Sequence, residues 1–180
     1  MSSQRTDGFK AGIQSGMTAT DIHSKKLDQQ VNNISKKIAN YTQVKTRGIK
    51  YQNKLKQFQI PGGIGSCSPD GGVWLDKNGK IIAAFEAKKQ GEIGNAIERW
   101  FKNEHILRKI NPMISYVTFC CGMGAKSNCI LEKTLNIVVL NKNNVPEFNI
   151  LRSNKNSIYL SHKGFTDNEI EKIMLDTILG

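Results

Sequence analysis

Two carboxylates and a lysine stand where a predicted hairpin would bring them together. Asp70 follows Pro69 just before the first strand of the hairpin, and Glu86 and Lys88 end its second strand. Residues two apart on a strand point to the same face, so Glu86 and Lys88 should project together while Ala87 turns into the core. Two converging carboxylates suit Mg²⁺, which completes its octahedron with waters and a substrate phosphate. A lysine beside that ion can orient or deprotonate an attacking water, so the set suits phosphodiester hydrolysis.

The same residues have a structural alternative. A Glu-x-Lys motif that stands alone on a strand is an exposed ion pair more often than an active site. Here the strand is apolar from Ile81 to Phe85, so its charged end should lie where a buried sheet meets a cleft. Together with the upstream Pro-Asp pair, this position favours the catalytic interpretation.

The elements that must position these residues follow an α/β pattern. The apolar stripe that begins at Leu27, the Asn78-Gly79 turn and a capping box at Thr166 are the clearest local signals. The pattern predicts helices over residues 21–45, 94–110 and 166–179, and strands over 73–75, 81–85, 115–121 and 136–140. We therefore expect an α/β fold with a central mixed five-stranded sheet flanked by helices.

Length and charge set the domain organisation and the class of partner. The 180 residues fit one domain, 1–180, with a basic helical N-terminal part (1–60), a catalytic and recognition core (61–140) and a C-terminal part (141–180). Lys and Arg outnumber Asp and Glu by 26 to 15, a net charge of +11 that suits a polyanion such as nucleic acid. Residues 45–58 carry five of these cations and no acid, which favours contact with a phosphate backbone.

Three short segments resemble the type II restriction endonucleases of the PD-(D/E)xK superfamily, and among them the EcoRI-like enzymes. The segments are Pro-Asp-Gly-Gly at 69–72, Glu-Ala-Lys-Lys-Gln-Gly at 86–91 and Gly-Asn-Ala-Ile-Glu-Arg at 94–99. The likeness covers about residues 69–122, a third of the chain, and the third segment is its most specific part. The resemblance implies the restriction-endonuclease-like fold of that superfamily.

The resemblance also implies roles for single residues. Asp70 and Glu86 would hold Mg²⁺ with the carbonyl of Ala87, and Lys88 would act on the nucleophilic water. Asn95 and Arg99 would meet adenine edges, which agrees with the paired donor and acceptor of asparagine and the donor fork of arginine. The full set of DNA-binding residues expected is Lys89, Gln90, Gly94, Asn95, Ala96, Glu98 and Arg99. A third carboxylate, Glu92 or Glu98, could also join the metal.

In the resembled enzymes the third segment accompanies an AATT core that a two-fold dimer reads as a palindrome. Five residues separate Lys88 from Gly94, fewer than in those enzymes, so elements that read outer G·C pairs should be missing. We expect Mg²⁺-dependent cleavage of double-stranded DNA at AATT, or at a six-base site centred on it, that leaves 5′ overhangs. The implied partners are a second copy of the chain and a cognate DNA methyltransferase that protects the same site.

The sequence leaves rival functions open. A structure-specific or repair nuclease could share the catalytic residues, a DNA-binding protein could carry an inactive nuclease core, and an RNA-binding module would explain the charge alone. No apolar run approaches the about 18 residues of a membrane span. We therefore expect a protein that does not bind membranes, and the resemblance to restriction endonucleases implies the cytoplasm of a prokaryote.

Overall fold

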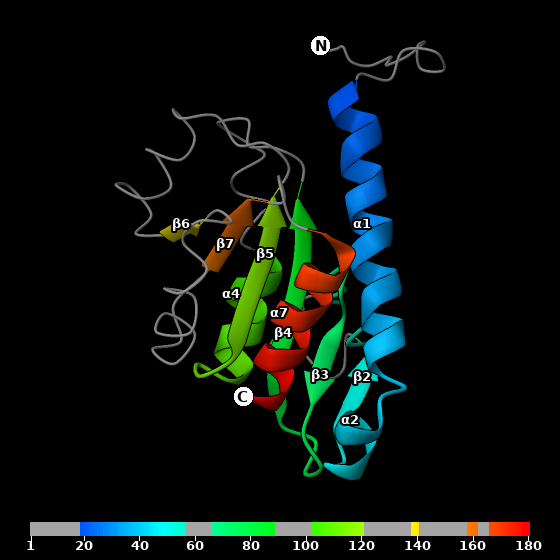
Figure 1. Cartoon of the computed structure of the whole chain (residues 1–180). Helices are drawn as coiled ribbons and strands as arrows, with labels where there is room; N and C mark the ends of the chain where they lie inside the picture. Colours follow the sequence, from blue (N-terminus) through cyan, green and yellow to red (C-terminus); the bar gives the residue numbers. More distant parts are fainter. Residues whose placement is uncertain (1–18, 57–65, 89–101, 121–137, 141–157, 162–165) are drawn as a thin grey trace.

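The computed structural model describes the chain in six segments (Figure 1). They are residues 19–56, 66–88, 102–120, 138–140, 158–161 and 166–180. Asp70, Glu86 and the backbone of Lys88 lie within them.

The described strands form one mixed sheet in the order β2-β3-β4-β5-β7-β6. Their bounds are Lys50–Gln52 (β2), Val73–Leu75 (β3), Ile81–Lys88 (β4), Ser115–Cys120 (β5), Val138–Leu140 (β6) and Ile158–Ser161 (β7). Neighbours from β2 to β4 pair antiparallel, and neighbours from β4 through β5 and β7 to β6 pair parallel. The predicted mixed α/β architecture is confirmed.

The predicted count of five strands is not confirmed, because the described sheet has six. Part of the difference is β2, which lies in the basic part that the sequence predicts to be helical. Its three residues, Lys-Tyr-Gln, show no apolar alternation, and their place in the sheet comes from backbone pairing with β3 at the edge. A strand held in this way leaves little signal in its side chains.

Helices cover both faces of the sheet. Their bounds are Ala19–Ile38 (α1), Thr42–Thr46 (α2), Lys102–Ile110 (α4) and Asp167–Leu179 (α7). Helices α1 and α7 pack in one buried cluster with Phe85 and Ala87, whereas α4 packs on the opposite face with Ala84 and Tyr116. Figure 1 shows α7 in front of the sheet and α4 behind it. Successive residues of β4 therefore face different helices.

The helix predicted over residues 21–45 is instead two helices. Chain direction changes at Tyr41, whose backbone is extended with φ −70° and ψ 141°. Its hydroxyl donates to Glu171 of α7, 130 residues away in the sequence. The apolar stripe itself is confirmed, because Leu27, Val31 and Ile38 are all at most 1% exposed.

The other predicted elements agree with the structure where it describes them. The capping box of α7 is present, with the Glu169 N–H donating to the Thr166 hydroxyl over 3.2 Å. The Asn78-Gly79 turn joins β3 to β4, and its Gly79 has a φ of +82°. The predicted strands 115–121 and 136–140 correspond to β5 and β6, and the predicted helix 94–110 corresponds to α4. Residues 94–101, 121 and 136–137 lie outside the described segments.

Gly71 lies in close contact with both α1 and β4. A Cβ at this position would lie 2.6 Å from the Phe85 Cβ and 2.9 Å from the Val31 Cγ1, so a side chain would push the helix and the strand apart. We expect Gly71→Ala to lower the free energy of unfolding by about 1–3 kcal/mol, as overpacking does in other cores. Urea denaturation measures this loss.

The control is Gly79→Asn in the hairpin turn. Gly79 has open space around it, and asparagine tolerates a positive φ. This variant should stay within about 0.5 kcal/mol of the parent chain. Equal stability of the Gly71→Ala variant and the parent would contradict the close approach.

Candidate active site

The site is built where the turn at residues 69–72 crosses the end of β4. The Gly71 N–H donates to the Phe85 carbonyl over 2.9 Å, and the Gly72 N–H closes the turn on the Pro69 carbonyl over 2.9 Å. Gly72 has a φ of +73°, and a Cβ there would lie 2.1 Å from the Tyr51 ring. The glycines of the Pro-Asp-Gly-Gly segment thus let the chain pass close to two strands.

Two hydrogen bonds from backbone N–H groups join the turn that carries Asp70 to the strand that carries Glu86. The Asp70 N–H donates to Glu86 Oε1 over 3.0 Å, and the Ala87 N–H donates to Asp70 Oδ2 over 3.0 Å. Glu86 is only 2% exposed, and Asp70 is half-buried. The structure therefore brings together the two carboxylates that the hairpin pattern predicted to converge.

Two further predicted residues lie on the same strand. Ala87 is buried in the cluster that contains Phe85, as the strand alternation predicts. The backbone of Lys88 pairs with that of Cys120 in the last register position shared by β4 and β5. Lys88 thus stands two residues beyond Glu86 in the same strand, and its side chain lies outside the description.

The DNA-binding residues predicted from the sequence lie outside the described residues. They are Lys89, Gln90, Gly94, Asn95, Ala96, Glu98 and Arg99. The same holds for Glu92, the other residue considered as a third carboxylate.

Helix α1 contributes a polar stripe that the sequence analysis missed. The Asn32 side-chain amide donates to the Asp70 carbonyl over 3.2 Å, and the Ser35 hydroxyl donates to the Gly71 carbonyl over 2.8 Å. Asp28, one turn before Asn32, adds a negative charge that acts on Asp70. Their spacing of four and three residues, directly beside the buried Leu27 and Val31, is the signal that could have identified them.

Helix α4 reaches the site from the other face of the sheet. The Asn103 side-chain amide donates to Glu86 Oε2 over 2.8 Å. The Cys67 thiol lies 3.9 Å from the Asn103 carbonyl. Burial, followed by the charge of Glu86, raises the pKa of Cys67 to about 12, so this free cysteine is a neutral thiol. It is a packing group rather than a nucleophile.

The electrostatics of the carboxylate pair match a cation site. Burial is the largest cause that raises the pKa of Asp70 to about 8, followed by the hydrogen bond with Glu86, the charge of Glu86 and the charge of Asp28. The Ala87 N–H acts in the opposite direction. The Asp70 carboxyl therefore takes up a proton more readily than an ordinary aspartate, and a divalent cation beside it would favour its charged form instead.

The donor set fits Mg²⁺ in its chemistry. It consists of hard carboxylate oxygens that converge from the turn and from β4, and Mg²⁺ needs only one or two such ligands when water and phosphate supply the rest. No group of three or more His, Cys, Asp or Glu that could hold a metal occurs among the described residues. A cage made entirely of protein ligands, of the kind zinc prefers, is therefore not found in this part of the chain.

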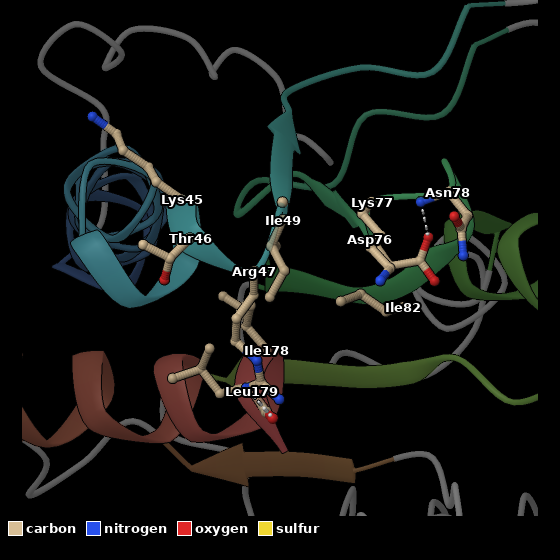
Figure 2. Close-up of a pocket in the computed structure, with 11 residues that line it drawn as sticks. Lys45, Thr46, Arg47, Ile49, Asp76, Lys77, Asn78, Ile82, Ile178 and Leu179 are labelled. Carbon is tan, nitrogen blue, oxygen red and sulfur yellow. Dashed lines mark hydrogen bonds between the residues drawn. The ribbon is translucent and has the colours of Figure 1, made fainter.

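A pocket of about 590 Å³ lies at the opposite end of β4, between the hairpin turn, the end of α2 and the end of α7. Figure 2 shows Ile49, Ile82 and Leu179 in this pocket, with the Lys45 side chain extending away from them. Asp76, the one acid in its lining, accepts the N–H groups of Asn78 and Lys80 over 2.9 Å and so stabilises the turn. The pocket has no converging acids, and the carboxylate pair is the better candidate for catalysis.

Comparison with known proteins adds no assignment. No protein-family model, curated protein or solved structure matches the chain. Among the described residues, no helix combines the length and the apolar character that crossing a membrane requires. Any function must therefore be argued from the residues and their geometry.

The raised pKa of Asp70 predicts a pH dependence of stability. An acid whose pKa rises on folding, here from 3.8 to about 8, binds its proton more tightly in the folded state. Folding stability should therefore fall as pH rises from about 4 to about 8. In the presence of EDTA, the melting temperature of the parent chain should decrease across this range, and Asp70→Asn should remove part of that decrease.

The matched control for this measurement is Asp176→Asn. Asp176 forms an exposed ion pair with Lys172 on α7, far along the chain from the turn that carries Asp70. Its variant should keep the pH slope of the parent. Parallel melting curves for the parent and the Asp70→Asn variant would show that Asp70 does not hold the proton.

Proposed function

We propose that the protein is a Mg²⁺-dependent type II restriction endonuclease of the PD-(D/E)xK superfamily that cleaves double-stranded DNA at a specific site. The observation that carries the proposal is the reciprocal pair of hydrogen bonds that joins Asp70 to Glu86 and Ala87. These bonds join the Pro-Asp element of the signature to its Glu-x-Lys element. Lys88 ends the same strand, which supports the third position of the signature.

Each residue would have a distinct part in phosphodiester hydrolysis. Asp70 and Glu86 would hold Mg²⁺, helped by the carbonyl of Ala87. When bound, the ion would supply Lewis-acid stabilisation of the scissile phosphate. Lys88 would orient or deprotonate the attacking water. The buried environment of Glu86 would strengthen these interactions, because a low local dielectric favours pairing between opposite charges.

Sequence recognition would come from the segment 94–99. Asn95, Ala96 and Arg99 would contact adenine edges in the major groove, Glu98 would fix Arg99, and Lys89, Gln90 and Gly94 would complete the DNA contacts. The segment ends three residues before α4, whose first turn contacts Glu86 through Asn103. Base reading and metal binding would therefore be joined by a short stretch of chain.

The DNA sequence recognised in this way would be AATT, or a six-base sequence centred on AATT. A palindrome is cut on both strands, so the working unit would be a two-fold dimer of this chain. Cleavage before the first adenine would leave 5′ overhangs. A methyltransferase that modifies the same site would protect the DNA of the prokaryotic cell in which the enzyme acts.

The basic tract at 45–58 offers the non-specific part of binding. Its cations Lys45, Arg47, Lys50, Lys54 and Lys56 are all exposed. Exposed cations that neutralise phosphates release counterions, which makes DNA affinity depend strongly on salt.

Cleavage of defined DNA tests the proposal directly. A Mg²⁺ digest of a plasmid of known sequence should give fragments whose ends map to AATT with 5′ overhangs. Asp70→Ala and Lys88→Ala should lower the cleavage rate by at least about a hundredfold, because each removes a group used in the transition state. Specific binding measured in Ca²⁺ should survive both changes.

Matched controls are Asp176→Asn and Lys80→Ala, which change a carboxylate and a lysine on exposed surfaces. Both should cut at the parent rate. Ends scattered over many sequences would favour a structure-specific or repair nuclease. DNA binding with no cleavage in any divalent metal would favour a non-catalytic DNA-binding protein.

Arg99 provides a separate test of base recognition. Arg99→Ala should cost about 1–3 kcal/mol of discrimination between AATT and a site with one changed base, because the donor fork is lost. Competition binding in Ca²⁺ measures this difference. Lys45→Ala is the control, since loss of a phosphate contact should weaken all sequences equally. The same uniform loss in Arg99→Ala would make Arg99 a phosphate contact only.

A further inference from the structure

The carboxylate of Glu86 is held from two sides by donors of different origin. Oε1 accepts the Asp70 backbone N–H over 3.0 Å, and Oε2 accepts the Asn103 side-chain amide over 2.8 Å. With one donor on each oxygen, the carboxylate plane has little freedom to rotate. A fixed plane matters for Mg²⁺, which demands near-ideal octahedral geometry.

Asn103 is itself held in place by the packing of α4. It lies in the first turn of that helix, whose Ile106 and Leu107 are buried against the sheet. Its own carbonyl lies 3.9 Å from the Cys67 thiol, and Cys67 in turn forms a two-way backbone bridge with Leu55. The amide therefore approaches Glu86 from a rigid element.

An amide is a suitable donor for this task. It donates a hydrogen bond to a carboxylate oxygen but carries no charge of its own. The carboxylate oxygens of Glu86 keep further lone pairs that a cation could bind. A lysine at the same place would compete with the cation instead.

From this geometry we infer that Asn103 is a positioning residue for the metal site and orients Glu86 for the divalent ion. The inference rests on the proposed function, because it assumes that Glu86 binds the ion. Asn103 belongs to α4, on the opposite face of the sheet from α1. The two acids proposed to bind the ion would therefore be positioned by helices on both faces. Residues that orient metal ligands typically change metal affinity by about tenfold or more when they are lost.

The chain supplies a matched control at the other end of the same helix. Asn111 directly follows α4, is buried, and donates its side-chain amide to the Ile81 carbonyl over 2.6 Å. Asn103 and Asn111 thus both link the α4 region to β4 through a side-chain amide. Asn103 donates to the carboxylate proposed to bind the metal, whereas Asn111 donates to a backbone carbonyl. A merely structural role for Asn103 predicts the same consequences for both.

The test is Mn²⁺ titration of the full chain by calorimetry, without DNA so that no heat of cleavage is recorded, for the parent and for Asn103→Leu. Leucine keeps the approximate shape of asparagine and lacks the donor. The dissociation constant for Mn²⁺ should rise about tenfold. In a parallel Mg²⁺ series, the cleavage rate should recover toward that of the parent at saturating metal. Asn103→Ala repeats the loss of the donor should leucine impair folding.

The controls separate positioning from stability. Asn111→Leu should lower the melting temperature and leave the Mn²⁺ dissociation constant unchanged, and His105→Ala, exposed on the same helix, should change neither. Unchanged Mn²⁺ affinity in both Asn103 variants would overturn the inference while leaving the proposed function intact. Equal weakening by Asn111→Leu would also overturn it. If the parent bound no divalent ion and cut no DNA, the proposed function itself would fail, and the inference with it.

Discussion

The reciprocal hydrogen bonds between the Asp70 turn and the end of β4 are the constraint on which the site depends. Each of the two acids accepts a backbone N–H from the other segment, so neither carboxylate can turn away without breaking a bond of about 3.0 Å. Burying two acids side by side is costly unless donors or a cation compensate. The remaining contacts of the site supply donors or hold the turn against the strand.

Hydrogen-bond donors from helices on both faces of the sheet offset part of the cost of burying the two acids. Asn32 and Ser35 of α1 hold the carbonyls of the turn, while Asn103 of α4 donates to Glu86 from the other face. The pKa of Asp70 nevertheless rises to about 8, mainly because of its burial, so these donors offset only part of the cost of burying its charge. Local destabilisation of this kind is typical of residues that are placed for function rather than for stability, which agrees with the proposed role of the two acids.

Local signals in the sequence were enough to predict most elements around the site. The apolar stripe of α1, the Asn78-Gly79 turn and the Thr166 capping box each act within a few residues, so their physics is readable from the chain. The break after α1 was not, because the contact that Tyr41 makes beside it, with Glu171 of α7, joins residues 130 apart in the sequence. The convergence of the two acids was predictable because hairpin pairing fixes which residues stand side by side.

The residues that support the acids were harder to predict, because their roles depend on which helix face meets the turn. Asp28, Asn32 and Ser35 have helical spacing, yet the sequence does not show that this stripe faces Asp70, which depends on the packing of α1 against the turn and the sheet. Asn103 depends on where α4 begins relative to β4. Since residues 89–101 connect Lys88 to Lys102, the segment that carries the predicted base-reading residues follows the end of β4 and precedes Asn103 by one residue. Both ends of this segment therefore lie close to Glu86, since Lys88 is two residues beyond Glu86 on β4 and Asn103 donates a hydrogen bond to its carboxylate. DNA that displaced the start of α4 would move this donor.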